Sequence, residues 1–182
     1  MKALVLFSGG IDSTTALALA INKYGKDRVI ALSVSYGQKH DKEIQAAIAV
    51  AEYYGVEHLF LDLRKIFTYS NCSLLKQSTE KIPEESYAKQ ISKTNGETPV
   101  STYVPFRNGL FLSSAASIAL SKDCEVIYYG AHADDSAGFA YPDCSPVFNR
   151  AMNEAIWEGS GHQLKIEAPF VNVSKAEVVR IG

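Results

Sequence analysis

The chain has 182 residues, of which 47% are hydrophobic, and its 18 basic and 20 acidic residues give a formal net charge of −2. This length is enough to bury a sizeable core, so we expect a single globular domain over residues 1–182. The charge balance does not favour nucleic-acid binding, and no apolar stretch reaches the roughly 20 residues that span a bilayer. We therefore expect a cytoplasmic protein with a small-molecule partner, no nucleic acid and no membrane.

The first predicted element is a strand over residues 3–7, which runs directly into the string SGGIDS at 8–13 and a helix-like run from Thr14. Two adjacent glycines allow positive φ and close approach to a ligand, and a helix amino end presents free N–H groups to an anion. The lysine of the GxxxxGK[ST] phosphate loop is absent, since no lysine follows Gly10 until Lys23. This pattern favours a site that holds the pyrophosphate of ATP while a substrate attacks the α-phosphorus. A tight strand-to-helix turn is the alternative.

The next elements continue the alternation of strands and helices. A second strand is predicted at 29–34, a helix from a cap at Asp41 to a stop at Gly55, and a third strand at 58–63. The second strand is followed by the polar run YGQKH at 36–40. Open parallel sheets bind ligands beyond the carboxyl ends of their strands, so this run is a candidate for nucleotide or carboxylate binding. A turn with a polar surface is the alternative.

The regular pattern is lost over residues 64–102, which are rich in lysine, glutamate and serine and contain two prolines. A long insertion in a compact domain is often a lid or a binding loop. A solvated surface excursion without a role is the alternative.

A helix is predicted from Asn108 to about Ala119, with Asn108 as its cap. Pro105 keeps the residue before it extended, which leaves Arg107 near the helix amino end. The guanidinium fork of Arg107 suits a phosphate or a carboxylate. A surface salt bridge is the alternative.

A fourth strand at 125–130 leads into a loop with three carboxylates, those of Asp134, Asp135 and Asp143, and with His132. Asp134 and Asp135 suit a magnesium ion shared with ATP phosphates, because this ion takes few protein carboxylates. Asp143 suits hydrogen bonds from a guanine-like base. Aspartates that only shape turns are the alternative.

The last predicted elements are a helix opened by Ser145 and Pro146, a strand at 163–168, and a helix with Ser174 and Glu177 as a capping box. The βαβα order predicts an α/β fold, an open doubly wound parallel five-stranded sheet with helices on both faces. The final helix is only beginning when the sequence ends. We therefore expect a further carboxyl-terminal segment.

Four strings in this order, SGGIDSTT, YGQKH, TYVPFRN and YPDC, resemble the 7-cyano-7-deazaguanine synthase family. These enzymes are N-type ATP pyrophosphatases of the PP-loop superfamily, which has an adenine nucleotide alpha hydrolase-like fold. The string SGGxDS recurs in NAD synthetase, asparagine synthetase and tRNA-thiolating enzymes, whereas TYVPxRN with YPDC is much more specific. The resemblance covers essentially the whole chain.

The resemblance implies a ligase that forms C–N bonds in queuosine precursor biosynthesis. Its substrates would be 7-carboxy-7-deazaguanine, ammonia and ATP with magnesium, and its product 7-cyano-7-deazaguanine. The substrate carboxylate would be adenylated, ammonia would displace AMP to give the amide, and a second activation would dehydrate the amide. The resemblance also suggests a homodimer.

The motifs assign roles to individual residues. The expected ATP-binding residues are Phe7, Ser8, Gly9, Gly10, Ile11, Asp12, Ser13, Thr14, Thr15, Ala16 and Leu17. The expected catalytic residues are Asp12, Ser13 and Arg107. The expected substrate-binding residues are Gln38, His40, Arg107, Asp134 and Asp143. The expected magnesium ligands are Asp12 and Asp134.

Two features depart from the family pattern. Ser145 follows YPDC where many relatives have an arginine, and the four cysteines of the family's zinc site are not present in this chain. The rival interpretation is a PP-loop tRNA thiolation enzyme, in which Cys144 would be one thiol, although Cys72 and Cys124 offer no obvious partner. A non-catalytic ATP-binding module is the other alternative.

Overall fold

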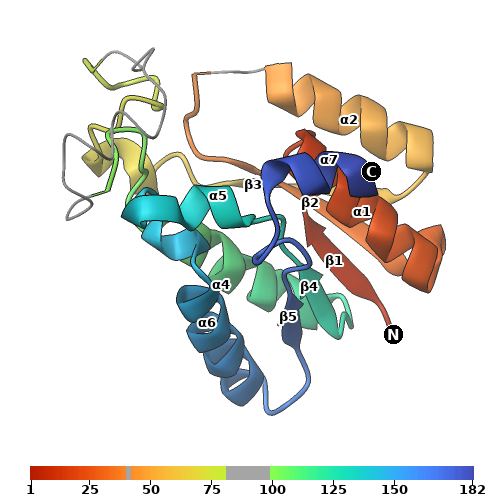
Figure 1. Cartoon of the computed structure of the whole chain (residues 1–182). Coiled ribbons are helices and arrows are strands. Elements are labelled where there is room, and N and C mark those ends of the chain that lie inside the picture. Colours follow the sequence, from red (N-terminus) through yellow and green to blue (C-terminus); the bar gives the residue numbers. More distant parts are fainter. Residues whose placement is uncertain (40–41, 81–98) are drawn as a thin grey trace.

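The protein was analysed as a computed structural model that describes residues 1–39, 42–80 and 99–182 (Figure 1). These residues form a five-stranded, wholly parallel sheet in the order β3-β2-β1-β4-β5. The strands are β1 (Ala3–Leu6), β2 (Val29–Ser35), β3 (Glu57–Asp62), β4 (Val126–Tyr128) and β5 (Lys165–Glu167). The chain runs outward from β1 in one direction through β2 and β3, and in the other through β4 and β5. The sheet therefore has a switch point at β1, which is where open α/β sheets bind ligands.

Helices cover both faces of this sheet, as predicted (Figure 1). One face carries α1 (Ile11–Tyr24), α2 (Lys42–Tyr54) and α7 (Lys175–Ile181), and the other carries α4 (Arg107–Ser121) and α6 (Pro146–Gly159). A short helix, α5 (Ala133–Ser136), follows β4. No helix in the described part of the chain is long and apolar enough to cross a membrane.

The central strand shows why the apolar runs are continuous rather than alternating. In β1, Leu4 and Leu6 pack toward α4 and α6, while Ala3 and Val5 pack toward α1, α2 and α7. Successive side chains of a strand point to opposite faces, and both faces of this sheet are buried. All four residues of β1 are accordingly buried.

Two predicted helix starts are corrected by the structure. Helix α1 begins at Ile11 with Gly10 as its cap, three residues before Thr14. Helix α4 begins at Arg107, so Asn108 lies inside the helix and is not its cap. The N–H of Asn108 is satisfied by a carboxylate from a distant loop, which local sequence pattern does not reveal.

Two other helix starts are confirmed. The hydroxyl of Ser145 accepts a hydrogen bond from the N–H of Phe148 at the start of α6. Ser174 and Glu177 form the predicted capping box of α7. Residue Asp41, the predicted cap of α2, lies outside the described residues.

The described part of the insertion, residues 64–80 and 99–102, is packed onto the domain. Phe67, Cys72 and Leu75 are buried in a cluster with Val104. Backbone hydrogen bonds also join this segment to the loop after β2, from Lys39 to Leu74 (3.0 Å) and from Lys76 to Gly37 (2.8 Å). These contacts attach the described part of the insertion to the domain, and the function of the insertion as a lid stays a prediction.

Candidate functional site

A cavity of about 360 Å³ opens at the carboxyl ends of the central strands. Its lining comes from the loop after β1, the end of β2 and the loop beyond it, the first turns of α2 and α4, and the loop after β4. The polar and aromatic residues that line it are Phe7, Ser8, Asp12, Ser13, Ser33, Tyr36, Gln38, Glu43, Arg107, Asn108, Phe111, Tyr129, Asp135, Tyr141 and Cys144. The cavity thus lies at the switch point of the sheet.

The two glycines of the loop after β1 have different roles. Gly9 has a φ of +80°, and a Cβ there would lie 2.5 Å from the backbone nitrogen of Ala47 in α2. Gly10 has an ordinary φ of −79° and caps α1. Side chains hold the loop in place, since the Ser13 hydroxyl donates to the Gly10 carbonyl and accepts from the Ser8 N–H, both at 3.1 Å. The amino end of α1 therefore faces the cavity in a fixed position.

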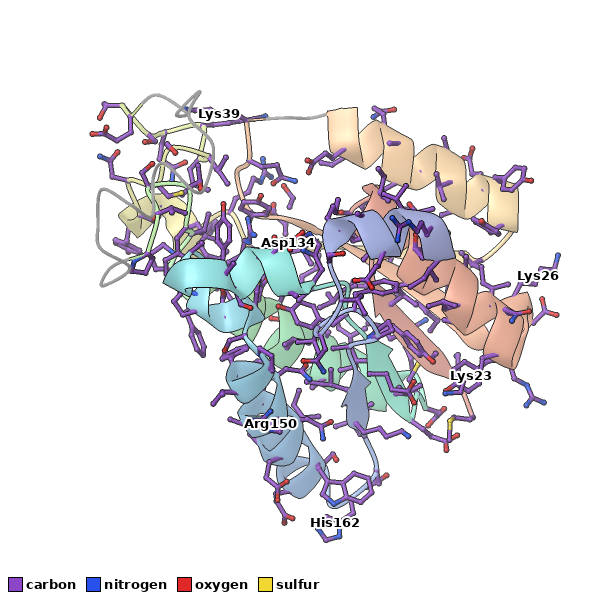
Figure 2. The ribbon with its side chains drawn as sticks, viewed as in Figure 1. Lys23, Lys26, Lys39, Asp134, Arg150 and His162 are labelled. Atoms are coloured by element: carbon purple, nitrogen blue, oxygen red, sulfur yellow. The ribbon has the colours of Figure 1, made fainter. Side chains whose placement is uncertain are left out.

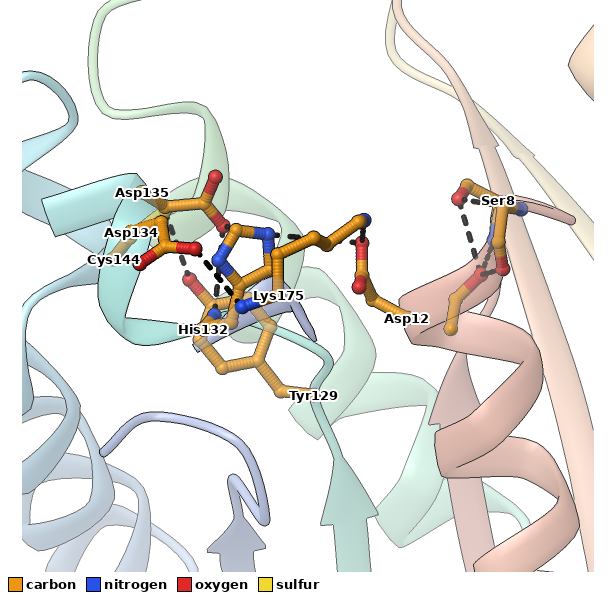
Figure 3. A network of polar contacts seen from close by, with 10 residues as sticks. Ser8, Asp12, Tyr129, His132, Asp134, Asp135, Cys144 and Lys175 are labelled. Atoms are coloured by element: carbon orange, nitrogen blue, oxygen red, sulfur yellow. Dashed lines mark hydrogen bonds and ion pairs between the residues drawn. The ribbon is translucent and has the colours of Figure 1, made fainter. Parts of the chain in front are cut away.

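A lysine reaches this loop from the far end of the chain. The ammonium group of Lys175, in the first turn of α7, forms an ion pair with the carboxylate of Asp12 (Figure 3). The backbone N–H of Lys175 donates to the Asp134 carboxylate at 2.9 Å, and Figure 2 shows Asp134 beside α7. Sequence reasoning missed Lys175. The sequence signal that could have identified Lys175 is its position directly after the cap Ser174, at the start of the helix that follows the fifth strand.

His132 links two carboxylates at the cavity wall. Its Nε2 lies 3.9 Å from Asp12 and 3.5 Å from Asp135, and its Nδ1 is buried without a partner among the described residues (Figure 3). Burial raises the pKa of Asp135, although His132 partly opposes this effect. Gly130 lets this loop approach, since a Cβ there would lie 3.3 Å from the backbone of Asp12 and Ser13.

A second cationic group, Arg107, lines another part of the cavity. Its Nη1 donates to the Tyr36 hydroxyl at 3.1 Å, and its guanidinium lies 5.1 Å from the centre of the Tyr36 ring. That ring packs in turn against Phe67 and Phe111, with ring centres 5.9 Å and 5.6 Å away. Burial raises the pKa of Tyr36, so this hydroxyl is neutral near pH 7.

Asp143 and Cys144 lie under the first turn of α4. One oxygen of Asp143 accepts from the N–H of Asn108 at 2.8 Å, and the other is buried without a partner among the described residues. The side-chain amide of Asn108 donates to the sulfur of Cys144 at 3.2 Å. Burial raises the pKa of the Cys144 thiol to about 12, and the nearby carboxylates of Asp135 and Asp143 add to this effect.

The structure brings only part of the predicted set to the cavity. The predicted residues that line it are Phe7, Ser8, Asp12, Ser13, Gln38 and Arg107. Thr15, Ala16 and Leu17 are buried on the inner side of α1. Asp134 and Asp143 bond to the first turns of α7 and α4 and are not among the lining residues. His40 lies outside the described residues.

The described residues contain no group of three or more histidine, cysteine, aspartate or glutamate side chains that could hold a metal ion. Each of the three cysteines is buried and free. The described part of the chain therefore offers nothing that fits a zinc site.

Comparison with known proteins places the chain in a family. Residues 2–182 match the family described as queuosine biosynthesis protein QueC. The 7-cyano-7-deazaguanine synthase of Oceanobacillus iheyensis is 40% identical over 184 residues, covering 100% of this chain and 77% of that protein. The enzyme of the same name from Thermoplasma volcanium is 41% identical over 187 residues, covering 100% and 72%.

A solved structure supports the fold assignment. The U34-tRNA thiolase NcsA from Methanococcus maripaludis, with its [4Fe-4S] cluster, superimposes with a TM-score of 0.57 at 17% identity, covering 100% of this chain and 56% of that one. At this identity the likeness shows the fold alone. The sheet is that of the PP-loop, adenine nucleotide alpha hydrolase-like enzymes, and the chain belongs to the QueC family of queuosine biosynthesis proteins.

Proposed function

We propose that the chain is an ATP-dependent ligase that converts 7-carboxy-7-deazaguanine and ammonia into 7-cyano-7-deazaguanine. The observation that carries this proposal is one cavity that joins a fixed anion-binding loop, at Ser8 to Ser13, to an aromatic region with a cation, at Tyr36 and Arg107. The names of the relatives support an enzyme of queuosine precursor biosynthesis.

The loop after β1 is the proposed binding site for the ATP phosphates. The free N–H groups at the amino end of α1 and the hydroxyl of Ser8 are the donors at this position, while the Ser13 hydroxyl donates to the Gly10 carbonyl and holds the loop. Lys175 brings an ammonium group to this loop from α7, where it pairs with the carboxylate of Asp12. These groups would stabilise pyrophosphate as it leaves the α-phosphorus.

Magnesium fits Asp12 and Asp135 better than the pair expected from sequence. Both carboxylates line the cavity, both lie near His132, and Oδ1 of Asp12 is buried without a partner among the described residues. Asp134 bonds to α7. Magnesium fills most of its coordination shell with phosphate and water oxygens, so two carboxylates are sufficient. When bound, the ion would neutralise charge on the phosphates.

The proposed reaction has two activations. An oxygen of the substrate carboxylate attacks the α-phosphorus and pyrophosphate leaves, giving an acyl adenylate. The nitrogen of ammonia then attacks the acyl carbon, AMP leaves and a proton is lost, giving the amide. The amide oxygen is adenylated by a second ATP, and loss of AMP and a proton gives the nitrile. Asp12, Ser13 and Arg107 are the proposed catalytic residues.

The tRNA thiolation alternative finds no support in the cysteines. A nucleophilic thiol needs a lowered pKa and access to solvent. Burial raises the pKa of Cys72 and of Cys124, and that of Cys144 rises to about 12. A non-catalytic ATP-binding module would have no use for the cation and aromatic residues at the other end of the cavity.

Mass spectrometry tests the proposal directly. The chain is incubated with 7-carboxy-7-deazaguanine, ammonium and Mg-ATP, and the nitrile, AMP and pyrophosphate are quantified. We expect two AMP and two pyrophosphate for each nitrile, as the two activations require. The Asp12→Asn variant should lose about 100-fold in rate, whereas the matched Asp27→Asn variant on an exposed turn should match the wild type. ATP bound without formation of any nitrile would contradict the proposal.

A further inference from the structure

We propose that Arg107 binds the carboxylate of the substrate, and that the Tyr36 side of the cavity holds the substrate's ring system. This inference rests on the proposed function and goes further, since it states which of the two anionic reactants Arg107 recognises. Three features of the structure support it. Arg107 has no directly bonded carboxylate, the start of α4 holds it in place, and it lies on other elements than the phosphate loop.

The first feature is a cation without a directly bonded anion, although, against the effect of burial, the charge of Asp143 acts on Arg107 through space and raises its pKa. The guanidinium of Arg107 is half-buried and lines the cavity, and its one polar partner among the described residues is the neutral Tyr36 hydroxyl. None of the carboxylates in the described part of the chain lies within ion-pair distance of it, Asp143 included. A charge removed from water is costly unless it is paired. An anionic ligand in the cavity would supply the missing partner.

The second feature is the rigid start of α4. Phe106 adopts the left-handed conformation (φ 53°, ψ 27°) and its ring covers the first turn, where a Cβ on Gly109 would lie 2.4 Å from it. Asp143 fixes the same turn through the N–H of Asn108. Strained residues of this kind persist only where the surrounding structure holds them. The backbone of Arg107 is therefore fixed at the start of α4, and the hydrogen bond to Tyr36 holds its side chain.

The geometry of the fork suits a carboxylate. Nη1 of Arg107 is engaged by Tyr36, which leaves the Nη2 and Nε donors without a partner among the described residues. A planar carboxylate accepts two parallel hydrogen bonds from such a fork. Tyr36 and Phe111 also line the cavity, and aromatic faces suit a flat ring system.

The third feature is that the phosphates already have a binding site on other elements. Ser8, Ser13 and the amino end of α1 belong to the loop after β1, and Lys175 reaches that loop from α7. Arg107 comes from α4 and contacts the loop after β2 through Tyr36. The cavity thus has a region of hydroxyl and N–H groups at the amino end of α1 and a separate cationic region at Arg107. A reaction between a carboxylate and a triphosphate needs a binding region for each.

Calorimetry without ATP tests this inference with two probes that differ in charge, 7-carboxy-7-deazaguanine and its carboxamide. The wild type should bind the acid more tightly than the amide. Arg107→Met should weaken binding of the acid by about 10- to 100-fold, as expected for a charge-assisted bidentate contact, and should leave the amide within about twofold. Arg107→Lys should recover only part of the loss, because an ammonium lacks the fork.

Two controls make the outcomes distinct. Arg150→Met removes an exposed arginine of α6 (Figure 2) and should leave both affinities unchanged. Binding of ATP to Arg107→Met should also stay within about twofold of the wild type, which reports that the variant is folded. If Arg107→Met keeps its preference for the acid, or loses ATP binding instead, the inference is overturned while the proposed function stands. If the wild type binds neither deazaguanine, both are overturned.

Discussion

The two glycines that follow β1 look equivalent in sequence, but they meet different physical demands. Gly9 needs both a positive φ and the absence of a side chain, because α2 passes directly over it. Gly10 has an ordinary backbone conformation, and a Cβ there would meet only the Ser8 hydroxyl, at 3.5 Å. The loop is therefore restricted to glycine at one position of the pair.

This difference predicts unequal effects on stability. Gly9→Ala should lower the free energy of unfolding by about 2–4 kcal/mol, from left-handed strain together with overpacking against α2. Gly10→Ala, the matched control in the same loop, should stay within about 0.5 kcal/mol of the wild type. Urea unfolding followed by circular dichroism measures both. Equal losses of unfolding free energy in the two variants would show that the contact with α2 does not restrict position 9 to glycine.

The thiol of Cys144 gives a second prediction at the scale of one residue. Its pKa of about 12 compares with a usual value of 9.0, so its thiolate fraction at pH 8 should be about 1,000-fold lower. Labelling by iodoacetamide, read by mass spectrometry, should therefore be far slower at Cys144 than in a free cysteine peptide. Rapid labelling of this residue in the folded protein would revive the thiolation alternative.

At the scale of the element, the start of α4 shows how a distant side chain can replace a local cap. Asp143 comes from the loop after β4 and accepts the N–H of Asn108, while Phe106 bends the chain into the helix. Carboxylates are favourable at a helix amino end because of its partial positive charge. Asp143, predicted to read the base, thereby acts on the position of Arg107.

The pKa of Asp143 gives this arrangement a measurable pH dependence. Burial raises that pKa above the usual 3.8, although the Asn108 N–H and Arg107 oppose the shift. A raised carboxyl pKa in the folded state means that the contribution of Asp143 to stability is full below about pH 4 and is lost as pH rises through the folded-state pKa. The ionised side chain at neutral pH therefore costs stability.

Two variants of Asp143 separate the effect of its charge from the effect of its hydrogen bond to the N–H of Asn108. Asp143→Asn keeps an acceptor for Asn108 and should gain stability relative to the wild type as pH rises from 4 to 7. Asp143→Ala also loses the cap and should be less stable than Asp143→Asn by about 1 kcal/mol. Urea unfolding across this pH range measures the difference. If the free energy of unfolding of the wild type instead rises relative to that of Asp143→Asn as the pH rises, the assigned direction of the pKa shift of Asp143 is wrong.

At the scale of the whole molecule, the cavity is assembled from loops that the sheet order brings together. The described part of the insertion completes this assembly, because Leu75 is fully buried and its neighbours exchange backbone hydrogen bonds with the loop after β2. Tyr36 lies in that loop and packs against Phe67 of the insertion. The insertion therefore supports the wall of the cavity that faces Arg107.

Removing that support should affect both stability and the loop after β2. Leu75→Ala should lower the free energy of unfolding by about 2–5 kcal/mol and speed hydrogen exchange at the amides of Lys39 and Lys76, which bond across the junction. Leu120→Ala, on an exposed part of α4, should cost less than about 1 kcal/mol. Unchanged exchange at both amides in Leu75→Ala would show that the segment docks independently of this side chain.

The sequence by itself determined the architecture. Apolar runs alternating with helical spacing predicted a parallel sheet covered on both faces, and the observed order β3-β2-β1-β4-β5 confirms it. Local chemistry also located two helix starts, at Ser145 and at Ser174 with Glu177. These features depend on residues that are close in the chain, so periodicity and capping patterns report them directly.

Only the tertiary structure decided how the charged groups are used. The contact of Lys175 with Asp12 spans 163 positions, that of Arg107 with Tyr36 spans 71, and that of Asn108 with Asp143 spans 35. Residue type marked most of these groups as candidates but did not pair them. Pairing depends on which loops the order of the strands brings to one edge of the sheet, and a local pattern carries no information about that distance.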